Sequence, residues 1–319
     1  MMKELIEKGI FGLLSIMLML GCKPYESVQP LQSMQDLQYP YEVQYVELEA
    51  GNSVAYIDEG KGNQTLVFIH GLGSYLPAWK RNIEQLKSQY RCVAIDLPGY
   101  GKSDKGDYDY SMKYFASTVA EVLEILKIDN ATIVGHSMGG QIAMTMALYH
   151  TEVVENLVLV APAGFETFHE GQKEWFKNTV TPRLIKLTSA EGIQTNLAYN
   201  FYDYPEEAKF MIEDRLAMRS AEDFEWYCYA IAESVAAMVN DPVFEYLDEI
   251  KAPTLVIFGK NDNLIPNRYL NPGPTIEIAQ SGASQLSNAT LKMINKCGHF
   301  AQFEKPEEVN QTIESFLSK

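Results

Sequence analysis

One serine stands in a setting that favours nucleophilic chemistry. Residues 133–140 read IVGHSMGG, so Ser137 lies between Gly135 and Gly139 in a Gly-X-Ser-X-Gly pattern. A strand-like run precedes the pattern and a helix-like run follows it, which predicts a tight turn where the glycines avoid clashes and the serine is exposed at a helix start. A helix N-cap is the alternative role for this serine. Catalysis requires partner groups elsewhere in the chain.

A base and an acid follow later in the chain, each directly after a strand-like run. A serine hydroxyl is a weak nucleophile, so it needs a base within hydrogen-bond reach. His299 follows the last such run, in NKCGHF, and Asp262 follows the preceding one, in LVIFGKND. A carboxylate holds the imidazole in one tautomer and stabilises its cation. The order predicts a triad of Ser137, Asp262 and His299, with a structural histidine and a loop or capping aspartate as the alternatives.

Acyl chemistry also needs donors for the developing oxyanion. The stretch FIHGLG ends a strand-like run with His70 and Gly71, and this glycine allows the chain to turn so that N–H groups point toward the serine. We expect the backbone N–H groups of Leu72 and Met138 to be the two donors. Because these are backbone groups, side-chain changes there act mainly through geometry.

Several other polar residues near these motifs are expected to be structural. His136, next to the serine, is expected to point away and pack, and His70 to orient its loop through hydrogen bonds. Asp96 and Asp104, in the turn DLPGYGKSD, are expected to cap or brace that turn.

The order of elements predicts an α/β fold. Residues 41–49 and 53–60 are strand-like and flank a Gly-Asn turn, which indicates an antiparallel hairpin. Short apolar runs then alternate with helix-like segments, such as 111–127 and 138–150. This alternation predicts a mostly parallel sheet with helices on both faces, in which ligands meet the carboxyl ends of the strands.

A long helical stretch interrupts the alternation after the sixth strand. Residues 165–250 are too many for a loop and predict a helical cap, which leaves 42–164 and 251–319 as the core. The cap is rich in aromatic residues and methionine. We expect most of these to form the cap's own core, and a minority to line an apolar substrate pocket.

Composition limits the classes of partner. The 319 residues carry a formal charge of −16, which disfavours binding to nucleic acid. Besides Cys22 the chain has three cysteines, Cys92, Cys228 and Cys297. Their spacing is not that of a metal site, so no metal or cofactor is expected, although one disulfide remains possible after export. The expected partner is a small-molecule substrate with an apolar portion, and the sequence leaves the oligomeric state open.

The N-terminus differs from the rest of the chain. Residues 9–21 form an apolar run of 13 residues ending before Cys22, a length typical of a signal-peptide core and short for a membrane span. Met-Leu-Gly-Cys at 19–22 resembles a bacterial lipobox. This predicts a signal peptide over 1–21 cleaved before a lipidated Cys22, a tether over 22–41, and a membrane-anchored lipoprotein facing the periplasm or cell exterior. An uncleaved anchor and an ordinary secretory signal are the alternatives.

Taken together, these motifs resemble the α/β-hydrolase-fold serine hydrolases over about residues 42–318. The matching features are HG at 70–71, DLPGYGKSD at 96–104, GHSMGG at 135–140, and then Asp262 and His299. The chain order of serine, acid and histidine is that of the family. The resemblance implies acyl transfer to water through a covalent acyl-enzyme on Ser137.

The resemblance leaves the scissile bond open. An esterase or lipase-like activity on carboxylic esters is the main expectation, because the cap is apolar and acidic and favours uncharged substrates. A C–C bond hydrolase of β-diketone-like substrates or an aminopeptidase for N-terminal proline would use the same triad. A non-catalytic ligand-binding protein on the same fold is the remaining alternative.

Overall fold

The computed structural model describes residues 28–318 and contains one eight-stranded sheet. The strands follow the spatial order β1-β2-β4-β3-β5-β6-β7-β8. The first two strands and β4 pair antiparallel, and all other neighbours from β4 to β8 pair parallel. The strands span Gln44–Glu47 (β1), Ser53–Glu59 (β2), Thr65–Ile69 (β3), Arg91–Ile95 (β4), Ala131–His136 (β5), Val154–Val160 (β6), Thr254–Gly259 (β7) and Ala289–Ile294 (β8).

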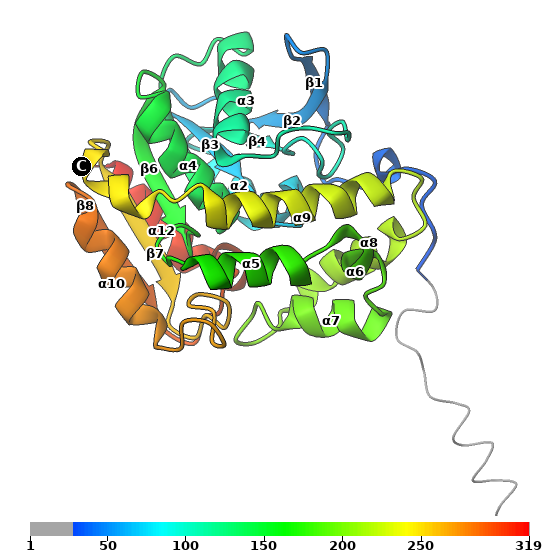
Figure 1. Ribbon diagram of the computed structural model, residues 1–319. Helices are drawn as coiled ribbons and strands as arrows, with labels where there is room; N and C mark the ends of the chain where they lie inside the picture. Colours follow the sequence, from blue (N-terminus) through cyan, green and yellow to red (C-terminus); the bar gives the residue numbers. More distant parts are fainter. Residues whose placement is uncertain (1–27, 319) are drawn as a thin grey trace, which may run out of the picture.

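Helices cover both faces of the sheet (Figure 1). Those outside the insertion are α2 (Lys80–Leu86), α3 (Met112–Ile125), α4 (Met138–Tyr149), α10 (Thr275–Gln285), α11 (Ala301–Glu304) and α12 (Pro306–Leu317), with short 3-10 turns η1 (Met34–Asp36) and η2 (Leu76–Trp79). The predicted fold class is confirmed, including the antiparallel hairpin and the helical insertion after the sixth strand.

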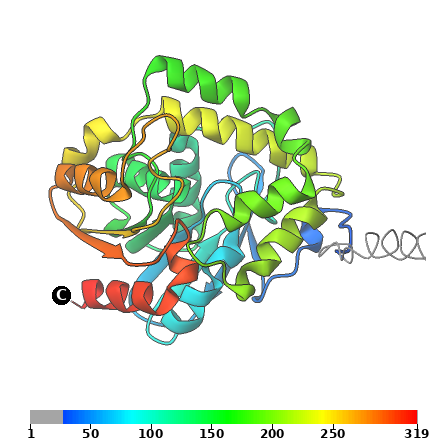
Figure 2. The ribbon, with the colours of Figure 1, turned by 90° about the horizontal axis from the view of Figure 1, so that it is seen from below.

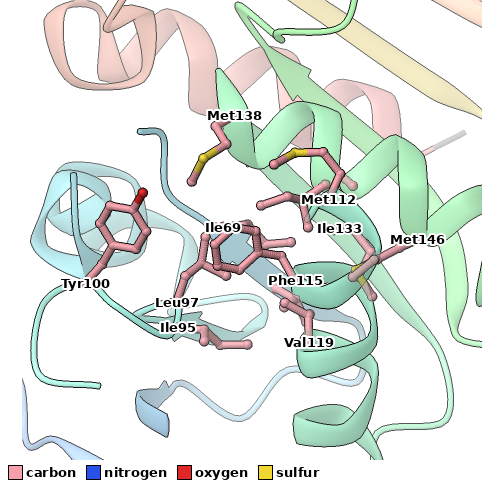
Figure 3. Packing of buried hydrophobic residues seen from close by; sticks show 14 of the residues in the cluster. Ile69, Ile95, Leu97, Tyr100, Met112, Phe115, Val119, Ile133, Met138 and Met146 are labelled. Atoms are coloured by element: carbon pink, nitrogen blue, oxygen red, sulfur yellow. The ribbon is translucent and has the colours of Figure 1, made fainter. Parts of the chain in front are cut away.

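The sheet buries two different apolar layers because successive side chains of a strand point to opposite faces. In β3, Val67 and Ile69 belong to the core cluster that includes α3 and α4, whereas Leu66 and Phe68 belong to the cluster that includes α2 and α12. Figure 3 shows the first layer, where Phe115 of α3 lies among strand residues. Burial on both faces explains why the parallel strands are continuous apolar runs.

Five α-helices lie between β6 and β7, and they cover the carboxyl ends of the strands (Figures 1 and 2). They are α5 (Glu170–Thr179), α6 (Pro182–Lys186), α7 (Ala190–Ala198), α8 (Lys209–Met218) and α9 (Phe224–Asn240), with η3 (Glu206–Ala208) before α8. The 3-10 helix η4 (Phe244–Glu249) packs instead on α4 and α10. The last part of the predicted cap, from 244 onward, therefore lies on the core, because Leu247 is fully buried there.

The prediction of a tether over residues 22–41 is wrong for the part that the structure describes. Met34 and Leu37 are buried in the main core cluster, and the hydroxyl of Tyr39 donates to Asp96 Oδ2 at 2.6 Å. The segment also crosses to the turn between α8 and α9, where the N–H of Leu31 donates to Ser220 Oγ at 2.9 Å. Buried apolar contacts spaced along the segment hold it on the body, although it has no helical or strand periodicity.

Residues 28–318 contain no helix long and apolar enough to span a membrane. The predicted signal peptide and Cys22 lie outside the described residues. The other three cysteines are buried and form no disulfide, so the possible bridge is not present in the described part of the chain.

Candidate active site

Ser137 occupies the bend between β5 and α4. Its backbone has φ 54° and ψ −118°, a conformation that costs a non-glycine residue about 1–3 kcal/mol. Backbone hydrogen bonds hold this conformation. The N–H of Ser137 donates to Val160 O at 3.0 Å, and its carbonyl accepts from Gly140 N at 2.8 Å and from Ala163 N at 2.9 Å. The neighbouring strand β6 thus fixes the strained residue, and the nucleophile pattern forms the turn predicted for it.

The two flanking glycines are required by close backbone approach. A Cβ on Gly135 would lie 2.2 Å from the carbonyl oxygen of Gly139, and a Cβ on Gly139 would lie 2.3 Å from the carbonyl oxygen of Ile69. Neither backbone atom can move aside without opening the contact of α4 with β3 or β5. The Gly-X-Ser-X-Gly spacing is therefore a packing requirement of the serine turn.

His299 and Asp262 meet at the same edge of the sheet. His299 Nδ1 lies 2.8 Å from Asp262 Oδ2. The other carboxylate oxygen, Oδ1, accepts the N–H groups of Leu264 at 2.8 Å and Ile265 at 3.0 Å. The side chain of Asp262 has no exposed area and that of His299 is 3% exposed. With Nδ1 donating to the carboxylate, Nε2 of His299 is left as the basic nitrogen.

The loop that carries His299 is held from the insertion. The N–H of His299 donates to the carbonyl of Asn200 at 2.7 Å, and Asn200 follows α7. Glu304 binds both sides of this contact, because its carboxylate accepts from Gly298 N at 2.7 Å and from Asp203 N at 2.8 Å. The position of the imidazole therefore depends on the insertion as well as on β8.

His136 packs beneath this imidazole. Its Nε2 lies 3.1 Å from the carbonyl oxygen of His299, and its ring centroid is 4.8 Å from that of His299 and 4.5 Å from that of Phe300. Burial, and then the nearby His299, lower the pKa of His136 well below its usual value. A neutral His136 with Nε2–H donates to the His299 carbonyl. The side chain packs as expected, and it also supports the backbone of the candidate base.

The loop after β3 lies against Ser137 on the other side. A Cβ on Gly71 would lie 3.1 Å from Ser137 Cβ, so this loop passes directly beside the serine. The side chain of Met138 is buried in the core, and its N–H is at the first position of α4, where helix geometry provides no internal partner. Leu72, Ser137 and His299 line one cavity. The two predicted oxyanion donors thus flank the serine, and their role remains a prediction.

His70 and Asp96 brace this loop, as expected. Leu97 N donates to His70 Nε2 at 3.1 Å, so His70 Nδ1 carries the proton and donates to Gly71 O at 2.8 Å. Burial lowers the pKa of His70, which keeps it neutral. Asp96 accepts from Leu76 N at 2.7 Å and from Lys102 N at 2.8 Å.

Two residues of the insertion, which the sequence did not single out for this role, hold the same loop from above. Tyr227 of α9 donates to the carbonyl of Gly73 at 2.8 Å, and Arg215 of α8 donates to the same oxygen. The Arg215 guanidinium also lies over the Tyr227 ring, 4.8 Å from its centroid. Arg215 and Tyr227 lie far from Gly73 in the chain, so no local sequence pattern predicts that they bind its carbonyl.

The cavity above Ser137 has a volume of about 610 Å³, and its walls come mainly from the insertion. Seven aromatic and methionine side chains of the insertion line it: Phe168, Phe176, Met211, Met218, Phe224, Tyr227 and Met238. Aliphatic side chains such as Ile185, Ile231 and Val235 complete the lining. The space beside the serine therefore suits an apolar group.

Two charged side chains also line the cavity. Glu166 accepts from Asn267 N at 2.9 Å and Asn271 Nδ2 at 2.8 Å, so its carboxylate braces the loop after β7; burial raises its pKa. Arg215 forms no ion pair with a carboxylate within residues 28–318. In the same range no group of three or more histidine, cysteine or acidic residues could hold a metal ion.

Comparison with known proteins identifies the fold family. Residues 64–306 match the family described as alpha/beta hydrolase fold. The chain belongs to this family. A 2-hydroxy-6-oxononadienedioate/2-hydroxy-6-oxononatrienedioate hydrolase of Burkholderia vietnamiensis is 31% identical over 276 residues, which cover 83% of this chain and 91% of that protein. The uncharacterised hydrolase YugF of Bacillus subtilis is 28% identical over 276 residues, which cover 81% of this chain and 92% of that protein.

A solved structure supports the same assignment. A probable hydrolytic enzyme from Pseudomonas aeruginosa superposes with a TM-score of 0.80 at 28% identity, covering 91% of this chain and 99% of that chain. The protein is therefore a hydrolase of the alpha/beta hydrolase fold. The bond that it cleaves has to be argued from its own site.

The two buried neutral histidines make stability depend on pH. The pKa values of His70 and His136 are lowered in the folded state. Below the histidine pKa of the unfolded chain, about 6.5, the unfolded chain therefore binds more protons than the folded protein, and the free energy of unfolding falls as the pH decreases below that value. Each histidine contributes a loss of about 1.4 kcal/mol per pH unit. We expect His70→Asn to reduce this slope by one histidine's share, measured by urea unfolding between pH 7 and pH 5. His169→Asn, at an exposed helix N-cap, is the control that should keep the slope. Equal slopes for all three proteins would contradict a neutral buried His70.

Proposed function

We propose that the protein is a serine hydrolase that cleaves carboxylic esters with an apolar acyl or alcohol portion. The observation that carries the proposal is the convergence of Ser137 and the Asp262-bound His299 on one largely apolar cavity. In this arrangement Ser137 Oγ attacks the ester carbonyl while His299 Nε2 takes the hydroxyl proton.

The same groups complete the reaction. As the tetrahedral intermediate forms, its oxyanion is bound by the N–H groups of Leu72 and Met138, a type of contact worth about 3 kcal/mol each. The protonated His299 then donates to the leaving alcohol, which gives an acyl-enzyme on Ser137. A water molecule, deprotonated by His299, hydrolyses this ester and restores the serine. Asp262 stays ionised throughout and stabilises the imidazolium.

The role of Asp262 can be tested by a single isosteric change. Asp262→Asn keeps an oxygen for the N–H groups of Leu264 and Ile265, but its amide donates to His299 Nδ1 and places the proton on Nε2, where it blocks the base. We expect kcat for a short p-nitrophenyl ester to fall on the order of 10⁴-fold with the fold unchanged by circular dichroism. Asp104→Asn, in a loop that braces β2 through Ser53 N, should keep wild-type kcat. An unchanged kcat in Asp262→Asn would place the acid elsewhere.

A C–C bond hydrolase is the second candidate, and one observation favours it. Arg215 lines the cavity without a carboxylate partner in the described chain, so it could bind a substrate carboxylate. The relative from Burkholderia vietnamiensis is named for cleaving a dioate. The apolar majority of the lining, and the use of Arg215 to hold Gly73, support the ester reading instead.

A substrate panel separates the candidates. We expect kcat/KM for neutral esters to increase with acyl length until the acyl chain fills the cavity, because each buried methylene contributes about 0.8 kcal/mol. This kcat/KM should also exceed, by at least tenfold, the values for proline amides and for β-diketones that bear a carboxylate. Ser137→Ala serves as the background for each substrate. A higher kcat/KM for the carboxylate-bearing diketones would overturn the ester proposal and assign Arg215 to substrate binding.

A further inference from the structure

The outer surface of the insertion carries large apolar side chains that face solvent. Trp175 of α5 is 45% exposed, Leu184 of α6 is 53% exposed, and Leu187, which follows α6, is 64% exposed. Trp226, in the first turn of α9, is 44% exposed. These four residues are called the outer cap face below. Both α5 and α6 pack on α9, and an ion pair between Lys186 and Glu225 joins α6 to the start of α9.

The inner sides of the same helices line the cavity. Phe176 and Val180 reach it from α5 and the segment after it, and Ile185 reaches it from α6. A globular core needs only one apolar side on a surface helix, so the second apolar side is not explained by folding. Tryptophan and leucine exposed together on short helices are typical of surfaces that enter a membrane interface.

The described chain begins beside this face. Leu31 and Ser220 exchange hydrogen bonds, and Glu222 N donates to Gln32 O at 2.9 Å, so the chain enters at the turn that leads into α9. Figures 1 and 2 both show α6 and the start of α9 at the end of the molecule where the described chain begins. Cys22 precedes residue 28 by six residues, a reach of at most about 20 Å. An attachment through Cys22, or through the apolar run at 9–21, would keep the outer cap face near the bilayer.

Charge favours the α5 and α6 part of this face, although Glu222, Asp223 and Glu225 lie beside Trp226 in the chain. Residues 170–187 carry four lysine or arginine residues and two glutamates, which leaves a local formal charge of +2 on a chain whose total is −16. An anionic lipid surface repels most of the acidic body but not this segment.

We propose that the outer cap face rests on a phospholipid bilayer, with Trp175 and Trp226 in the interfacial layer and Leu184 and Leu187 in contact with the acyl chains. The contact does not depend on the proposed hydrolysis, and the experiment below measures it without turnover. It would bring α5 and α6 between the lipid and the cavity, so that an apolar substrate could pass from one to the other.

The tryptophan content makes this contact measurable. The chain has three tryptophans, and the third, Trp79, is fully buried. The full-length protein is reconstituted into vesicles of phosphatidylcholine and phosphatidylglycerol, with or without bromine on the acyl chains. We expect brominated lipid to quench the tryptophan emission of the wild-type protein. The emission of each single variant, Trp175→Phe or Trp226→Phe, should be quenched to a smaller extent. The double variant, which keeps only Trp79, should show no quenching.

A serine pair tests the surface as a whole. Leu184→Ser with Leu187→Ser should reduce the quenching, because both leucines lie on the outer cap face. Ile125→Ser with Tyr149→Ser should leave it unchanged, because these side chains are also exposed, at 43% and 54%, but lie at the ends of α3 and α4. Emission that is the same in brominated and ordinary vesicles overturns the proposal. If the emission changes with protein concentration and not with bromine on the lipid, the outer cap face binds a second copy of the chain. That result also overturns the proposal.

Discussion

The whole site depends on one strained residue held in a narrow bend. Ser137 has a positive φ that only the surrounding contacts make stable, and those contacts include Val160 at the end of β6 and Ala163 just after it. The bend is so tight that Gly135 and Gly139 approach backbone oxygens at distances no Cβ could occupy. The cost of the bend is local, and its effect is to place a hydroxyl beyond the carboxyl edge of the sheet, beside the first turn of α4. Neighbouring strands then need only deliver their own side chains to that edge.

The insertion does more than cover this edge. Through Tyr227 and Arg215 it binds the carbonyl of Gly73, in the loop that passes beside Ser137, and through Asn200 it binds the N–H of His299. Both flanks of the serine are thus held by the element that also lines the cavity. A change in the cap that alters the shape of the cavity would also alter the position of His299 or of the loop that contains Gly73. This coupling explains why the insertion is fixed to the core by polar backbone contacts as well as by apolar packing.

The sequence predicted those parts of the molecule whose cause is local. Continuous apolar runs marked the parallel strands because both sheet faces are buried, and the glycine spacing around Ser137 marked its turn. Asp262 and His299 were found because each follows a strand and chain order limits the choices. Arg215, Tyr227 and Asn200 were not found in their positioning roles, since each acts on a residue far away in the chain. Residues 31–41 were misjudged for the same reason: Met34 and Leu37 are buried by distant elements, and no period within the segment records this. In the cap, helices that face both cavity and solvent carry apolar residues on two sides, which hid the seven that line the cavity.

The most direct test of the catalytic assignment is the site of covalent modification by a fluorophosphonate, which reacts preferentially with a serine activated by a neighbouring base. Peptide mapping by mass spectrometry of the labelled full-length protein should find one adduct per chain, on the peptide that contains Ser137, and none in the Ser137→Ala protein. An adduct on another residue, or equal labelling of the two proteins, would contradict the proposed nucleophile and the arrangement built around it.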